Sequence, residues 1–166
     1  PGYLAFEPIA GISRKNIDTS NLNLPLYNKN YIIDDKFTGT NPNFTERAFY
    51  YDDKGRIVQM VERNHLGGIS RYTTRYDFLG NILSIHELHQ KSENAANDKL
   101  EKQFTYDRRN RPLVDSARVN DGEWAVVSYN YDDLGSLTGK TYGKGDNTIT
   151  DSLKYNIQGW LTEQKN

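Results

Sequence analysis

The hexapeptide Tyr51-Asp52-Asp53-Lys54-Gly55-Arg56 sets the architecture of this chain, because close copies of it return four more times. The copies read YDFLGN at 76–81, YDRRNR at 106–111, YDDLGS at 131–136 and YNIQGW at 155–160. From tyrosine to tyrosine the spacings are 25, 30, 25 and 24 residues, in the range of periods that indicates a repeat architecture. The chain is therefore predicted to use one structural unit five times.

Each copy has the chemistry of a tight hairpin turn. The Asp or Asn after the tyrosine can accept a hydrogen bond from a backbone N–H about two residues on, and the residue four places after the tyrosine supplies a positive φ. That residue is glycine in four copies and Asn110 in the third, and asparagine is the non-glycine residue that best tolerates this conformation. The predicted structural turn residues are Tyr51, Asp52, Gly55, Tyr76, Asp77, Gly80, Tyr106, Asp107, Asn110, Tyr131, Asp132, Gly135, Tyr155, Asn156 and Gly159.

The residues that flank the turns alternate with a period of two. Phe49 and Tyr51 fall on one face of a strand, for example, while Arg71, Thr73 and Arg75 fall on the polar face of another. This pattern is typical of half-buried strands, so each copy reads as strand, turn, strand. The predicted fold is all-β: an antiparallel up-and-down meander of about five hairpins, forming a twisted and curled sheet.

Two segments interrupt the repeat pattern. Residues 1–43 lack the motif and are predicted to be an irregular lead-in that packs on the sheet or pairs with it, ahead of a repeat sheet over 44–166. Residues 86–102 fit either a short helix or a strand–loop–strand, and the register of the repeats favours the second.

The Y-D-x-x-G-R-aliphatic pattern resembles the YD repeat of the Rhs (rearrangement hot spot) family, and residues 155–162 resemble the form found in Rhs-like proteins of Bacteroidetes. The resemblance covers roughly residues 44–166. It implies large secreted or cell-surface proteins whose repeats wind into a long antiparallel sheet, in some members a shell around a C-terminal toxic polypeptide. The chain is accordingly expected to be a structural scaffold module, cut from a longer exported protein whose neighbouring repeats are its partners.

The composition of the chain argues against several other classes of function. With 21 basic and 22 acidic side chains the formal net charge is −1, so no nucleic-acid partner is predicted. The sequence has no run of 18 apolar residues, so no membrane insertion is predicted either. The absence of cysteine excludes disulfides and thiolate metal sites. Localisation therefore depends on the resemblance, which indicates a secreted or cell-surface protein.

No catalytic residue, metal site or cofactor is predicted, and the chain is not expected to be an enzyme. His86 and His89 would point to opposite faces of a strand, and no third ligand lies nearby in the sequence. The turn acids already serve as acceptors for backbone N–H groups. An arginine that follows the turn glycine, such as Arg56, is expected to pair with the carboxylate of a neighbouring turn rather than with a ligand.

A second hypothesis uses aromatic residues that the turn motif does not constrain. Tyr50, Tyr72, Trp124 and Tyr129 are candidates for stacking on sugars or anchoring a protein partner. An adhesive module that binds a glycan or a protein through the aromatic face thus stands beside the scaffold hypothesis. Unpaired strand edges, around residues 160–166 and at the first strand, also predict an edge-strand dimer.

Overall fold

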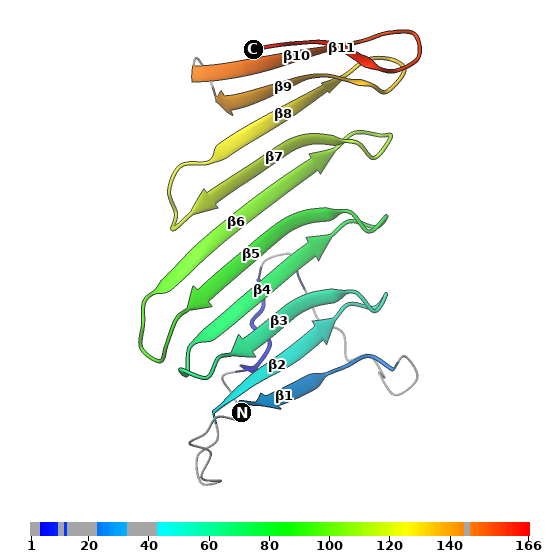
Figure 1. Cartoon of the computed structure of the whole chain (residues 1–166). Helices are drawn as coiled ribbons and strands as arrows, with labels where there is room; N and C mark the ends of the chain where they lie inside the picture. The colour runs from blue at the N-terminus through cyan, green and yellow to red at the C-terminus, as the bar shows by residue number, and fades with distance from the viewer. Residues whose placement is uncertain (1–3, 10–11, 13–22, 33–42, 145–146) are drawn as a thin grey trace. The chain divides into compact units, whose positions relative to one another are not determined.

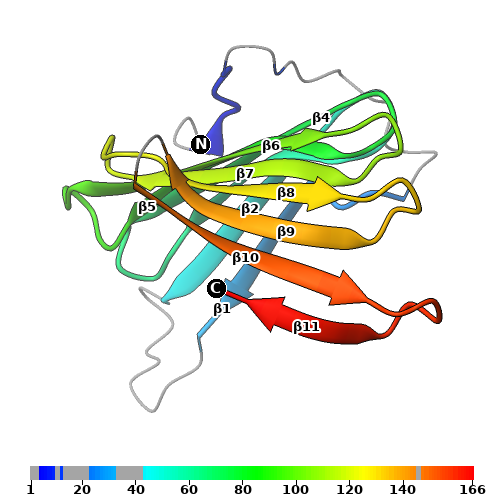
Figure 2. The same cartoon turned by 90° about the horizontal axis from the view of Figure 1, so that it is seen from above.

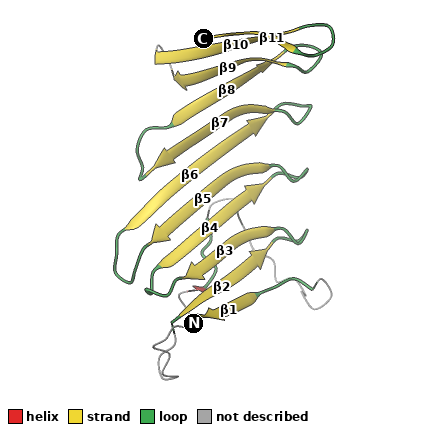
Figure 3. Ribbon diagram, in the orientation of Figure 1, coloured by secondary structure: helices red, strands yellow, loops and turns green. Residues whose placement is uncertain are grey.

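A computed structural model describes residues 4–9, 12, 23–32, 43–144 and 147–166. The described residues form eleven strands in one antiparallel sheet, whose strand order is the order of the sequence (Figures 1 and 3). The strands are β1 (Tyr27–Tyr31), β2 (Phe44–Tyr51), β3 (Ile57–Arg63), β4 (Ile69–Tyr76), β5 (Ile82–Gln90), β6 (Asn97–Tyr106), β7 (Pro112–Val119), β8 (Ala125–Tyr131), β9 (Leu137–Lys144), β10 (Asn147–Tyr155) and β11 (Leu161–Lys165). The predicted all-β meander is confirmed.

The sheet is open, because β1 and β11 stand at the two ends of the strand order. The pronounced curl expected from the sequence is not confirmed. Residues 86–102 are strand, loop and strand, since β5 ends at Gln90 and β6 begins at Asn97, so the favoured interpretation of this segment is confirmed.

The chain divides into two compact units, Pro1–Leu100 and Glu101–Asn166, and each is described by itself. The first unit contains β1 to β5 and the start of β6. Five hairpins account for ten strands, β2 to β11, so the repeat count did not predict β1. It lies within the predicted lead-in and pairs with β2 from Tyr27 opposite Ala48 to Tyr31 opposite Phe44. Residues 1–3, 10–11, 13–22 and 33–42 of the predicted lead-in lie outside the described residues.

All five motif copies form the turns that join β2 to β3, β4 to β5, β6 to β7, β8 to β9 and β10 to β11. In every turn the Oδ1 atom of the Asp or Asn accepts the backbone N–H of the residue four places on, at 2.8–3.0 Å. The fifth residue of every copy has a positive φ, and the values are 76° for Gly55, 102° for Gly80, 65° for Asn110, 102° for Gly135 and 80° for Gly159. The local turn chemistry is thus the same throughout.

The strand register shows which residues of the first unit share a face. Tyr50, Gln59, Thr73 and His86 lie directly opposite one another on β2 to β5, and so they form one cross-strand row. The next row, on the other face, consists of Phe49, Met60, Tyr72 and Glu87.

Residues 4–9 of the lead-in lie against the face of the first row (Figure 2). The Tyr50 hydroxyl donates to the Leu4 carbonyl at 2.5 Å, and the Phe6 ring lies 5.4 Å from the Tyr50 ring. Leu4, Ala48 and Val61 form a small buried apolar cluster. This cluster lies on the face opposite Phe49, while Tyr51 is also buried and donates its hydroxyl to the Pro25 carbonyl of the lead-in.

Polar groups occupy much of that covered face. Gln59 and Thr73 are almost completely buried, with 0% and 1% of their surface exposed. The Gln59 amide accepts the Glu7 N–H at 2.9 Å, donates to the Glu7 carbonyl at 2.9 Å and donates to the Thr73 hydroxyl at 3.0 Å. Burial of these groups is tolerated because each has a hydrogen-bond partner.

Candidate functional site

Several hydrogen bonds and ring contacts join one motif turn to the next. We call the turns at 51–56 and 76–81 the first turn pair, those at 106–111 and 131–136 the second, and those at 131–136 and 155–160 the third. The first pair lies in the first unit, and the other two lie in the second unit.

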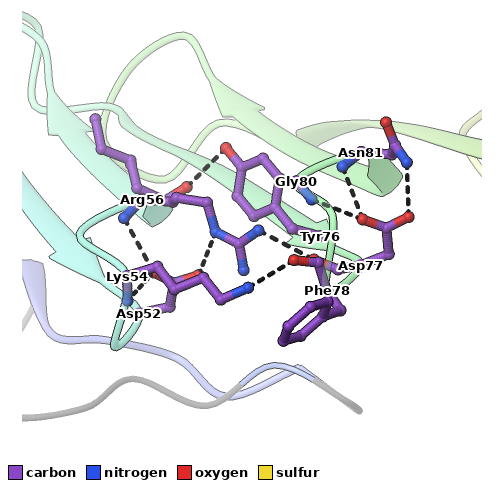
Figure 4. Close-up of polar contacts among 9 residues, drawn as sticks. Asp52, Lys54, Arg56, Tyr76, Asp77, Phe78, Gly80 and Asn81 are labelled. Atoms are coloured by element: carbon purple, nitrogen blue, oxygen red, sulfur yellow. Dashed lines mark hydrogen bonds and ion pairs between the residues drawn. The ribbon is translucent and has the colours of Figure 1, made fainter.

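Arg56 joins the two turns of the first turn pair (Figure 4). Its Nε donates to the Asp52 carboxylate of its own turn at 2.6 Å, and its Nη1 donates to the Asp77 carbonyl of the next turn at 3.0 Å. The guanidinium carbon lies 4.6 Å from the centre of the Tyr76 ring. Such a planar cation on an aromatic face is attracted by the ring quadrupole.

Lys54 makes a second connection in the same pair. Its ammonium donates to the Phe78 carbonyl at 2.6 Å and lies 4.0 Å from the centre of the Phe78 ring (Figure 4). The Tyr76 hydroxyl also donates to the Ile57 carbonyl of the preceding hairpin at 3.2 Å. Three side chains thus hold neighbouring turns of the first unit together.

The second turn pair repeats this chemistry. Arg111 binds the Asp107 carboxylate at 2.6–2.7 Å, and its guanidinium carbon lies 4.3 Å from the centre of the Tyr131 ring. Arg109 donates to the Asp133 carbonyl at 2.9 Å, from the position that Lys54 holds in the first pair. The stacking of an arginine on the tyrosine of the next turn therefore occurs in both pairs, although Arg111 Nη1 has no hydrogen-bond partner among the described residues where Arg56 Nη1 binds a carbonyl.

The predicted role of the arginine needs one correction. The carboxylate that Arg56 binds belongs to its own turn, whereas the neighbouring turn supplies a backbone carbonyl and an aromatic ring. The reason is geometric, because the carboxylate of Asp77 is already occupied by the Gly80 N–H, the Asn81 N–H and the Asn81 side-chain amide.

The predicted turn tyrosines occupy several environments. Tyr51 is buried and donates to the Pro25 carbonyl at 2.6 Å, while Tyr76 and Tyr131 lie under Arg56 and Arg111. Tyr106 and Tyr155 are half-buried. In the fifth turn Asn156 takes the place of aspartate and accepts the N–H groups of Gln158 and Trp160 at 3.0 and 2.9 Å.

Hydrogen bonding sets the charge of the turn aspartates. Desolvation raises the pKa of Asp52 and of Asp77, but the hydrogen bonds that these carboxylates accept outweigh it and place both pKa values below the usual range. For Asp107 and Asp132 the largest influence is the backbone N–H of Arg111 and of Ser136, which lowers the pKa. All four side chains are therefore held as carboxylates at neutral pH.

We expect acid to destabilise the protein through these four turns. Because their pKa values are lower in the folded than in the unfolded state, the stabilisation is complete above the unfolded pKa of about 3.9 and is lost as pH falls through the folded values. Thermal melts from about pH 6 to about pH 2 should show this loss. A variant with Asp52, Asp77, Asp107 and Asp132 all changed to Asn should lose less on acidification, since Asn156 already forms the same turn. An equally steep loss in that variant would contradict the expectation.

The four aromatic ligand candidates occupy different environments. Tyr50 and Tyr72 lie in rows on opposite faces of the first unit. In the second unit the Tyr129 hydroxyl donates to Asp115 at 2.8 Å, and burial together with this carboxylate raises the pKa of Tyr129 to about 12. Trp124 is half-buried, and the guanidinium carbon of Arg118 lies 4.8 Å from the centre of its ring.

The histidines show no common site. His86 stands opposite Thr73, whereas the His89 ring lies 2.8 Å from the Ser70 hydroxyl on the other face. Within the described ranges, no group of three His, Cys, Asp or Glu side chains is placed to hold a metal ion. The described part of the chain also contains no helix that is long and apolar enough to cross a membrane.

No protein-family model matches the sequence, and no curated protein matches it. The resemblance to the Rhs family thus depends on the five motif copies and their regular spacing.

Proposed function

We propose that the chain is a structural repeat module of a secreted or cell-surface protein of the Rhs type. In this role it contributes sheet to a scaffold, or to a shell that in the full-length protein encloses a toxic polypeptide. The observation that carries the proposal is the double use of one turn contact: Arg56 on Tyr76, and Arg111 on Tyr131. Motif side chains that bind the next turn are what a repeat scaffold requires, because each repeat is stabilised by its neighbour.

The edges of the sheet support the same role. β11 is paired with β10 on one side and ends the strand order, so its other edge presents backbone N–H and C=O groups. Neighbouring repeats of a longer chain, or the edge of a second copy, would satisfy these groups. The proposed partners are accordingly further repeats, with an edge-strand dimer as the form taken by the isolated chain.

The proposal assigns no catalytic role and no cofactor to the chain. The recurring carboxylates are held in the ionised form by turn hydrogen bonds, whereas a general acid needs a pKa raised toward neutrality. The recurring polar residues are thus explained by turn formation.

Labelling of intact cells tests the proposed location. An antibody raised against the purified chain should stain the surface of intact cells that make the protein, or should detect it in their medium. A cytoplasmic control protein should be stained only after permeabilisation. If the protein itself were stained only in permeabilised cells, the proposed location would be wrong.

A glycan array separates the scaffold from the adhesive module. The scaffold proposal predicts no specific glycan binding, because Tyr50 and Tyr129 use their hydroxyls within the chain and Trp124 lies under Arg118. Specific binding that is abolished by Trp124→Ala would instead support the adhesive module. The matched control is Trp160→Ala, since Trp160 is 68% exposed and belongs to the fifth turn.

A further inference from the structure

The third turn pair lacks the side chain that fills the first two. At the position of Arg56 and Arg111 the fourth hairpin has Ser136, whose N–H and hydroxyl both bind Asp132. A serine side chain is too short to reach the Tyr155 ring of the next turn, which corresponds to Tyr76 and Tyr131. The ring-stacking position of the third pair therefore has no arginine from its own hairpin.

The structure has an open groove at this place. It has a volume of about 510 Å³, and its lining includes Asp132, Ser136, Leu153, Tyr155 and Asn156. The equivalent hollow of the first turn pair, which Arg56 lines together with Asp52 and Tyr76, has a volume of about 170 Å³. The groove of the third pair thus corresponds to this hollow but lacks, among the described residues, both its arginine and a counterpart of Ile12, which also lines the hollow.

Arg56 is held by the Tyr76 ring, the Asp52 carboxylate and the Asp77 carbonyl, and each has a counterpart in the groove. Tyr155 corresponds to Tyr76. The Asp52 carboxylate corresponds to Asp132, whose pKa is lowered chiefly by the Ser136 N–H, so that it is negatively charged at neutral pH. The Asp77 carbonyl corresponds to that of Asn156. Each of these carbonyls accepts the N–H of its turn glycine, at 3.3 Å in the second turn and 2.9 Å in the fifth, and Asp77 shows that the carbonyl can accept a guanidinium as well.

One positive side chain, Lys154, also lines the groove. Its ammonium pairs with Glu163 at 2.7 Å and so is directed to that carboxylate, which also binds the Lys165 ammonium at 2.5 Å. Two aliphatic side chains border the same groove: Leu134 is 93% exposed and Ile157 is fully exposed. Exposed aliphatic side chains beside a binding groove are typical of a protein-binding surface.

We propose that this groove binds an arginine side chain of a partner protein. The guanidinium stacks on Tyr155 and donates to the Asp132 carboxylate and the Asn156 carbonyl, while Leu134 and Ile157 contact the apolar residues beside that arginine. Arginine fits this site better than lysine because a planar guanidinium can stack on a ring and donate in two directions at once. Binding at this groove does not depend on the scaffold role. NMR titration measures it, whereas cell labelling and the glycan array test the scaffold role.

Titration of the full chain with N-acetyl-arginine amide, followed by amide chemical shifts in NMR, tests the proposal. We expect shifts confined to residues 132–136 and 153–159, with a Kd on the order of 1 mM. The citrulline analogue, which has the same shape and no charge, should bind about tenfold more weakly. Equal binding of the two analogues, shifts elsewhere, or no shifts would overturn the proposal.

Two variants sharpen the test. Asp132→Asn should weaken arginine binding about tenfold and leave the turn intact, because Asn156 forms the same turn with an amide oxygen. Ser136→Arg should abolish binding, since its own guanidinium would fill the groove as Arg56 fills the first pair, and it should raise Tm. Unchanged binding in either folded variant would contradict the proposal. Self-association of the wild-type chain that Ser136→Arg abolishes would show that the occupant is a second copy and would overturn the assignment to a separate partner.

Discussion

Replacing Gln59 by leucine is expected to lower the free energy of unfolding by about 3 kcal/mol. Leucine fills a similar volume, so the loss arises from hydrogen bonding and not from a cavity. The substitution removes the bonds to the Glu7 N–H, the Glu7 carbonyl and the Thr73 hydroxyl. Thr73 is 1% exposed, so its hydroxyl would be left buried with one partner fewer. Urea denaturation followed by far-UV circular dichroism measures the change.

Gln103→Leu provides the matched control for that substitution. Gln103 lies on β6 with its side chain exposed, so the same change there should alter stability by no more than about 0.5 kcal/mol. The double variant Gln59→Leu with Thr73→Val should recover part of the loss, because it removes both members of a buried pair. Equal stability of the Gln59 and Gln103 variants would show that the contact with the lead-in contributes little to stability.

The hairpins could be predicted from the sequence because their determinants are local. The bond from the residue-56 N–H to Asp52, like its four equivalents, joins residues four apart. Asn110 has a positive φ, and its residue type made this predictable because asparagine tolerates that conformation better than other non-glycine residues. Interactions of this range can be recognised within the six-residue motif. Because five copies follow one another along the chain, they also predicted sequential hairpins and hence the strand order.

The contacts between turns could be predicted only in part. The sequence shows an arginine after the turn residue in the first and third copies, and Asn81 or Ser136 in the second and fourth. That alternation indicates that each arginine contacts one particular neighbouring turn. Whether the neighbour offers a carboxylate, a carbonyl or a ring depends on how closely the turns approach, and this distance is set by residues about one repeat away. The expected carboxylate of the neighbouring turn is therefore not part of the contact: Arg56 binds the carboxylate of its own turn, and the neighbour supplies a carbonyl and a ring.

The buried face of the first unit could not be predicted. Glu7 and Gln59 are separated by 52 residues, and neither belongs to a recurring pattern. Period-two alternation shows that a strand has two faces, but it cannot show which of them another segment covers. Residues 4–9 of the lead-in lie against the row with Gln59 and Thr73, so these two polar residues are about as buried as the apolar Val61.

Replacing Gly80 or Gly135 by valine is expected to lower the free energy of unfolding by about 2 kcal/mol each. Both glycines have a φ of 102°, which a β-branched side chain adopts only with strain. At Gly135 an added Cβ would also contact the Nη1 of Arg111, whose guanidinium lies on Tyr131, at 3.4 Å. The loss should therefore be at least as large at Gly135 as at Gly80, where the nearest Arg56 atom is 3.9 Å away.

Asn110→Gly is the control that separates backbone strain from other effects of a turn mutation. Asn110 occupies the same turn position with a φ of 65°, so glycine can take its place without strain and the stability should change by less than about 1 kcal/mol. Thermal melts and urea denaturation of the three variants measure the difference. If valine were tolerated at both glycines as well as glycine is at Asn110, positive φ would not be what the fifth motif position requires. The motif would then be conserved across the five copies for its side-chain contacts alone, and Asn110 would no longer be explained by the backbone.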